Sequence, residues 1–139
     1  MLAKLRHLFE KSPPTEFRDS VLGVLVSRHL GVWCGDVPFQ GSSVALLIPG
    51  SRQRPDATRL AQARQVVEVL PSLVSAAMHF AHERRAELSP DRLRFGALNY
   101  FCGDSPEYFC LDFVEAGDES GNCWQVHFCA GQPTDLDYT

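Results

Sequence analysis

The chain has 139 residues, of which 45% are hydrophobic and 22% are charged, and its formal net charge is −4. This length and composition predict one folded domain that buries roughly 68% of its unfolded surface, and they exclude a wholly disordered chain. The most apolar stretch, residues 66–81, contains Glu68, Pro71 and His79 and is shorter than the ~20 residues of a membrane-spanning helix, so it is predicted to be a core helix.

The first residues predict a short amphipathic helix over residues 1–12. Its apolar face consists of Leu2, Leu5, Leu8 and Phe9, and prolines 13 and 14 end it. Because Lys4, Arg6 and His7 interrupt this segment, it does not resemble a signal peptide. We therefore expect a cytoplasmic protein, whose five cysteines remain free thiols in a reducing compartment.

In residues 21–48, apolar and polar side chains alternate as they do along β-strands. Three runs cover residues 21–27, residues 32–40 around a predicted turn at Gly35-Asp36, and residues 42–48. They predict an antiparallel β-meander.

Two helices are predicted next. Asp56 is placed to cap a helix that begins near Ala57. Pro71 is unfavourable inside a helix but suits the first turn of a new one, so we expect two helices that meet near Leu70. The second is expected to end before Pro90.

Three further strands are predicted at residues 93–101, 107–115 and 123–130, and residues 131–139 are expected to form an acidic tail. The alternation places Tyr108, Asp112, Gln125 and His127 on a polar outer face. The predicted fold class is α+β: an N-terminal helix, an antiparallel β-meander, two central helices and a C-terminal antiparallel β-meander, packed as a single sandwich.

The outer face contains residue types that occur in thiol enzymes. Cys110 would supply a nucleophile, His127 a base and Asp112 an orienting carboxylate. However, a cysteine on a sheet face is usually a small packing residue, and catalytic thiols prefer helix N-termini or strained turns. We therefore expect no catalytic residues, and a small thiol-dependent enzyme using Cys110 and His127 is the alternative.

A zinc site is the other chemistry considered. The side chains of suitable type are Cys102, Cys110, Cys123, His127 and Cys129. Their spacing lacks the short Cys-x-x-Cys knuckle that places two thiolates on one tetrahedron. We therefore expect no metal and no cofactor.

Charge is divided unevenly along the chain. Residues 1–94 contain all 13 Lys and Arg against nine acids, whereas residues 95–139 contain eight acids and neither Lys nor Arg. These acids are Asp104, Glu107, Asp112, Glu115, Asp118, Glu119, Asp135 and Asp137. A surface of one sign attracts opposite charge and repels nucleic acid and anionic lipid. We therefore expect a basic protein partner, and neither a nucleic-acid nor a membrane partner.

Several short motifs resemble those of one group of proteins. They are Phe17-Arg18-Asp19, Leu22-Gly23, Trp33, Phe39-x-Gly41, Val44-x-Leu46, the paired helices and Trp124-x-Val126. Over residues 17–130 the chain resembles a family of uncharacterised small bacterial α+β domains that are often encoded beside secreted toxins. The resemblance implies an immunity-type role and no catalytic residues.

Together these patterns favour a non-enzymatic immunity protein that neutralises a cognate bacterial toxin through an acidic surface. The expected contact residues are Asp104, Glu107, Tyr108, Asp112, Glu115, Asp118, Glu119 and His127. An adaptor subunit of a secretion assembly, docked through the N-terminal helix, is a further alternative.

Overall fold

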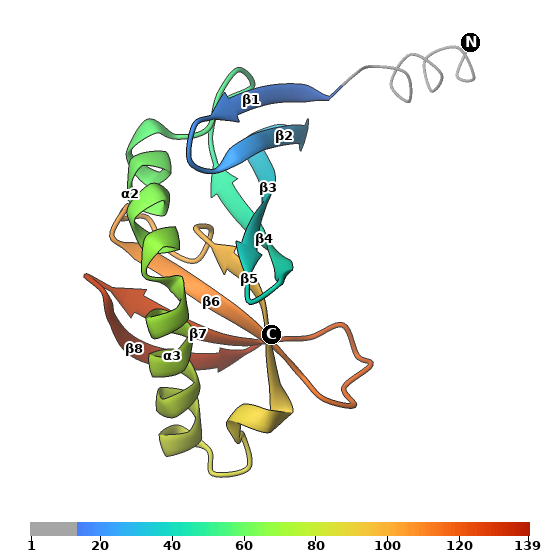
Figure 1. Ribbon diagram of the computed structural model, residues 1–139, viewed down its shortest axis with the longest axis vertical. Coiled ribbons are helices and arrows are strands. Elements are labelled where there is room, and N and C mark those ends of the chain that lie inside the picture. Colours follow the sequence, from blue (N-terminus) through green and yellow to red (C-terminus); the bar gives the residue numbers. More distant parts are fainter. Residues whose placement is uncertain (1–13) are drawn as a thin grey trace.

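Eight strands lie side by side in one sheet, in the order in which they occur in the chain (Figure 1). The computed structural model describes residues 14–139. The strands are β1 Thr15–Asp19, β2 Gly23–His29, β3 Val32–Phe39, β4 Ser42–Pro49, β5 Leu93–Asn99, β6 Tyr108–Glu115, β7 Trp124–Cys129 and β8 Gln132–Tyr138. Neighbouring strands are antiparallel except β4 and β5, which are parallel.

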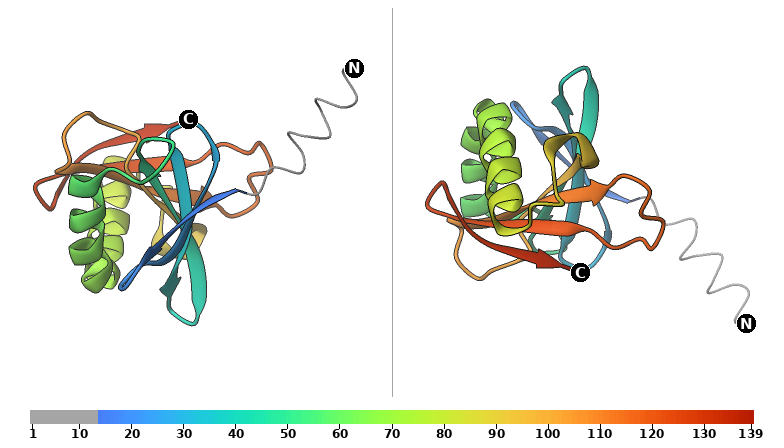
Figure 2. Two further views of the ribbon diagram at one scale, coloured as in Figure 1. Left: turned by 90° about the horizontal axis from the view of Figure 1, so that it is seen from above. Right: turned by 90° about the horizontal axis from the view of Figure 1, so that it is seen from below.

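Two helices, α2 Ala57–Glu68 and α3 Leu70–Arg84, follow one another along one face of the sheet (Figures 1 and 2). The Asp56 carboxylate accepts the backbone N–H of Arg59 at 3.0 Å and so caps α2. Pro71 lies in the first turn of α3, where a backbone N–H would have no acceptor within the helix, so the lack of an N–H in proline breaks no helical hydrogen bond. The predicted cap and the predicted division near Leu70 are thus confirmed.

The predicted fold class is wrong in its topology. The two β blocks are not separate meanders packed as a sandwich, because the chain crosses over through α2 and α3 and returns in the same direction. Strand β5 then pairs with β4 at Ala45, Leu46 and Leu47 and joins both blocks into one mixed sheet. The predicted N-terminal helix, residues 1–12, lies outside the described residues.

Two local predictions also differ from the structure. Gly35 and Asp36 lie inside the continuous strand β3, and a Cβ at residue 35 would overlap the end of the Leu25 side chain and displace it. The two-residue turn instead follows Phe39, at Gln40 and Gly41, which both have positive φ as a type I′ hairpin turn requires.

Residues 132–138, expected to form a tail, are the edge strand β8. Ala130 and Gly131 again have positive φ and make the type I′ turn that connects β7 to β8.

The hydrophobic core lies between the helices and the sheet. Its largest fully buried side chains include Trp33, Tyr100, Phe109, Phe113 and Phe128. The face of β6 opposite the predicted polar face points into this core, since Phe109, Leu111 and Phe113 are all buried. No helix within residues 14–139 is long and apolar enough to cross a membrane.

Candidate functional site

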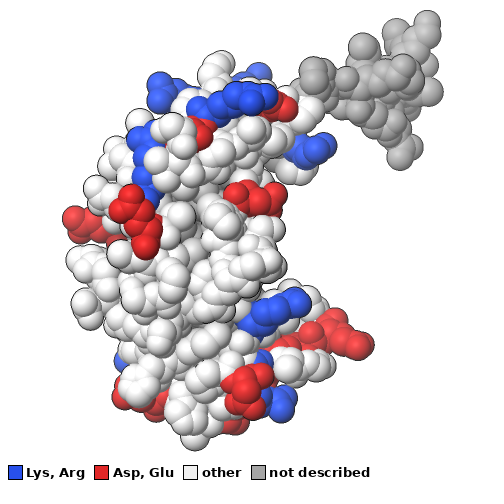
Figure 3. Space-filling model, viewed as in Figure 1, with Lys and Arg blue, Asp and Glu red and all other residues white. Residues whose placement is uncertain are grey.

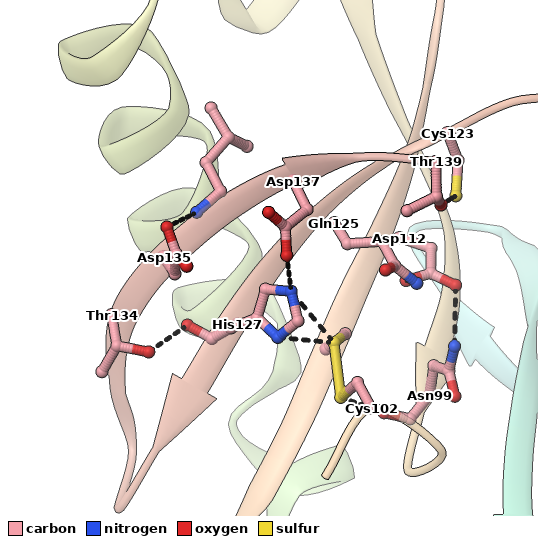
Figure 4. Close-up of polar contacts among 12 residues, drawn as sticks. Asn99, Cys102, Asp112, Cys123, Gln125, His127, Thr134, Asp135, Asp137 and Thr139 are labelled. Atoms are coloured by element: carbon pink, nitrogen blue, oxygen red, sulfur yellow. Dashed lines mark hydrogen bonds and ion pairs between the residues drawn. A yellow bond between two sulfur atoms is a disulfide. The ribbon is translucent and has the colours of Figure 1, made fainter.

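Strands β6, β7 and β8 gather sulfur, imidazole and carboxylate groups on the sheet face that points away from the core. The register places Cys110 beside His127, and Asp112 beside Gln125, on the neighbouring strands β6 and β7. Strand β8 adds Asp137 next to Gln125. Two polar clusters result, and they lie within one or two residues of each other along these strands (Figure 4).

The first cluster combines two sulfur atoms with an imidazole. Cys102, in the loop after β5, forms a disulfide with Cys110 across a Cα–Cα distance of 6.2 Å. The Cys110 Sγ lies 3.3 Å from Nδ1 of His127. On the other side of the ring, Nε2 of His127 donates to the Asp137 carboxylate at 2.7 Å. The ring is therefore held between the sulfur pair and the edge strand.

The second cluster surrounds Asp112. Its carboxylate accepts hydrogen bonds from the side-chain amides of Asn99, at 3.2 Å, and Gln125, at 3.1 Å. Burial raises the pKa of Asp112, although both hydrogen bonds act in the opposite direction. Asp112 therefore does not orient His127, and the acid that does so is Asp137.

The polar outer face is less open than the sequence suggested. Cys110 is fully buried and His127 is only 9% exposed, while Tyr108, Asp112 and Gln125 are half-buried. The expectation of five free thiols is also wrong, because Cys102 and Cys110 are paired. The centroid of the Tyr108 ring lies 5.8 Å from that of the His127 ring.

Three of the five candidate metal ligands meet at this point. The ligand atoms of Cys102, Cys110 and His127 all lie within 4.8 Å of one another. Cys129 is exposed, and Cys123 contacts Thr139 near the end of the chain, so neither joins the group. The alternation of β6 and β7 indicated the proximity of Cys110 and His127, whereas no sequence signal indicated Cys102, and Asp137 was missed together with strand β8.

Most of the residues predicted to contact a partner are placed at the two ends of β6, and Asp112 lies within the strand. Asp104, Glu107 and Tyr108 lie at its beginning, whereas Glu115, Asp118 and Glu119 lie at its end. An eight-residue strand is about 24 Å long, so these acids do not surround a single end of the sheet.

Some of these acids support the fold. Glu115 accepts a hydrogen bond from the Trp124 indole at 3.2 Å and lies 3.9 Å from Arg92. Asp118 accepts the Tyr138 hydroxyl at 2.6 Å, and hydrogen bonds from Ser120 and Tyr138 lower the pKa of Asp118.

Other acids are free to meet a partner. Asp104, Glu107 and Glu119 are exposed, and within residues 14–139 their side chains form neither hydrogen bonds nor ion pairs.

A groove of about 620 Å³ lies elsewhere, where β4 and β5 diverge next to α3. It is lined by apolar and small polar side chains, and Arg94 is its one charged residue within the described part of the chain. It contains none of the predicted contact residues.

Comparison with known proteins adds no relative: no family model, curated protein or solved structure matches the chain. The family resemblance carried by residues 17–130 therefore stays a prediction.

Proposed function

We propose that this chain is a non-enzymatic binding protein that takes a basic protein partner, and that the partner is a toxin that it neutralises. The binding region is the part of the molecule built from β6, β7, β8 and their connecting loops, which we call the acidic surface. Its acids are Asp104, Glu107, Asp112, Glu115, Asp118, Glu119, Asp135 and Asp137, and Tyr108 and His127 accompany them.

One observation carries this proposal: three neighbouring strands and their loops contain eight acids and not one Lys or Arg. The net negative charge of this region raises the rate of encounter with an oppositely charged partner. Two arginines of the preceding part of the chain lie beside it, since Arg59 donates to the Asp104 carbonyl and Arg92 is 3.9 Å from Glu115. The basic side chains belong to the rest of the chain, and Figure 3 shows many of them gathered at the end of the molecule formed by β1, β2 and the nearby loops.

The separation of the acids is compatible with one partner. A standard protein interface covers about 800 Å² on each protein, a patch roughly 28 Å across. Strand β6, which has acids at both of its ends, is about 24 Å long, so an interface of this size is long enough to reach from one end of the strand to the other.

A toxin that acts on nucleic acid is basic around its substrate site, because that site must neutralise phosphates. An acidic protein that covers such a site would compete with the substrate for the same charges. This chemistry makes a toxin that cleaves or binds nucleic acid a suitable partner.

The structure offers less support for a thiol enzyme. A nucleophile has to reach its substrate, but Cys110 is fully buried and its sulfur is bonded to Cys102. Asp112, the carboxylate of the predicted trio, is occupied by Asn99 and Gln125.

The proposal is tested by capture and rescue in the native cell. The wild-type chain is used as bait beside a variant with Asp104→Asn, Glu107→Gln and Glu119→Gln. We expect the wild type alone to capture a basic protein that stops growth when expressed by itself, and co-expression of the wild type to restore growth. Equal capture by both baits, or captured proteins that are harmless, would contradict the proposal.

A further inference from the structure

We propose that Cys102, Cys110 and His127, once the cysteines are reduced, form a zinc-binding site, with Asp137 as the residue that orients the imidazole. The proposal is independent of the proposed function. It follows from the identity of the three donor atoms, from their positions and from the charge that the site would carry.

The donor atoms are close enough together for one zinc ion to bind all three after reduction, once the two sulfur atoms have separated and the His127 ring has turned. Zinc binds thiolate sulfur at about 2.3 Å and imidazole nitrogen at about 2.0 Å, which places a sulfur and a nitrogen on the same ion about 3.6 Å apart. The Cys110 Sγ and His127 Nδ1 are already 3.3 Å apart, and the Cys102 Sγ lies within 4.8 Å of both.

The imidazole has the carboxylate partner that is usual for a zinc-binding histidine. The Asp137 carboxylate accepts a hydrogen bond from Nε2–H, which leaves the free lone pair of His127 on Nδ1, the nitrogen nearer the Cys110 sulfur. The same sulfur is only 4.0 Å from Nε2, so the ring has to turn before this lone pair points at an ion that it shares with the sulfur. A carboxylate on the distal nitrogen is the usual partner of a metal-binding histidine, since it fixes the tautomer and makes the ring a stronger ligand.

Charge balance suits a buried site. Two thiolates and a neutral imidazole around Zn²⁺ sum to zero, whereas an unpaired ion would be costly beside the buried Cys110 and His127. Within residues 14–139 no fourth Cys, His, Asp or Glu joins the group, so the fourth position would be open to water on the side of the half-exposed Cys102.

The disulfide and the zinc site are alternative states of one cysteine pair. Two molecules of a low-molecular-weight thiol give two electrons and two protons to the Cys102–Cys110 disulfide and become one disulfide themselves. Zinc then displaces the two protons from the new thiols and binds both thiolates. Binding is therefore expected of the reduced protein and not of the oxidised one.

Cobalt(II) is the spectroscopic probe, because tetrahedral cobalt thiolates show an ultraviolet charge-transfer band and strong visible absorption. We expect the reduced full-length chain to bind one Co²⁺ with this spectrum and to lose it to one equivalent of Zn²⁺. Cys102→Ser removes one of the two thiolates and should abolish the charge-transfer band that the two thiolates give together. Cys34→Ser and Cys129→Ser change exposed thiols outside the group and should leave the titration unchanged.

Asp137→Asn gives the finer test, because residue 137 lies on the edge strand and is 52% exposed, so the fold should tolerate the change. We expect zinc affinity, measured by competition with a chromophoric chelator, to fall about 10-fold to 100-fold while the cobalt spectrum keeps its shape. Absence of the band in the reduced wild type, equal binding by the oxidised protein, or loss of the band in Cys129→Ser would each overturn the assignment.

Discussion

Neutralising Asp104, Glu107 and Glu119 together is expected to slow association with the basic partner about 10-fold at low ionic strength. The three side chains are exposed and form no polar contacts within residues 14–139, so Asn and Gln at these positions remove charge without disturbing packing. The dissociation rate should change less than the association rate, because steering acts on the encounter. Stopped-flow mixing with the purified partner over a series of salt concentrations measures both rates.

A matched control removes the same number of charges elsewhere. Asp36, Glu68 and Glu87 are exposed acids of the preceding part of the chain, and their neutralisation changes the net charge equally. We expect this control to alter the association rate by less than about twofold. If both triple variants associate at the same rate, net charge and not the acidic surface governs the encounter.

Replacing Asp19 by Asn is expected to destabilise the fold by about 2 kcal/mol near neutral pH. One oxygen of the buried Asp19 carboxylate accepts the N–H groups of Val21 and Leu22, at 3.0 and 2.9 Å, and closes the β1–β2 turn. The other accepts hydrogen bonds from the Arg64 guanidinium and so ties this turn to α2. The side-chain NH₂ of an asparagine at residue 19 would face the N–H donors that now point at the Asp19 carboxylate, so donor would meet donor.

The pH dependence of this stabilisation has a definite sign. The Arg64 guanidinium lowers the pKa of Asp19 from 3.8 to about 2, with the Leu22 and Val21 N–H groups acting in the same direction against burial. Between these two values the unfolded chain binds more protons at this residue than the folded chain, so stability rises with pH across the interval. The contribution is complete above about pH 4 and is lost as the pH falls toward 2.

Urea unfolding of the wild type and Asp19→Asn, near pH 7 and again below pH 3, measures this effect. The difference between the two proteins should shrink at the lower pH, because protonation removes the charge that the variant lacks. Asp36→Asn, at an exposed residue, serves as the control and should be neutral. A difference that does not vary with pH would show that the ion pair with Arg64 is not the cause.

The helices were predictable because their signals are local. Asp56 accepts an N–H three residues later, and Pro71 can occupy only the first turn of a helix without breaking it. The parallel pairing of β4 with β5 had no such signal. It joins residues about 50 positions apart, and the periodicity of each strand says nothing about which strand lies beside it.

Strand β8 was missed although a signal was present. Gly131 follows Ala130 directly after an alternating run, which is the place of a two-residue hairpin turn, and apolar Leu136 alternates with Asp135 and Asp137. The composition of residues 131–139 outweighed this pattern and suggested a tail. Acidic residues are suited to an edge strand, since their charge opposes pairing with other chains.

The candidate site was predicted only in part, because only some of its residues are brought together by the alternation within a strand. The alternation of β6 and β7 places Cys110 and His127 on one face, and this was anticipated. Cys102 reaches the site from a loop, and Asp137 reaches it from the strand that was missed, so the disulfide and the orienting carboxylate both depend on tertiary structure.

Hydrogen exchange with and without the purified partner tests most directly whether the acidic surface is the binding region. We expect the partner to slow exchange in β6, β7, β8 and the loops at both ends of β6, and to leave β1, β2 and β3 at their original rates. Slowed exchange confined to β1–β4 or α2, with β6–β8 unchanged, would contradict the proposed binding region.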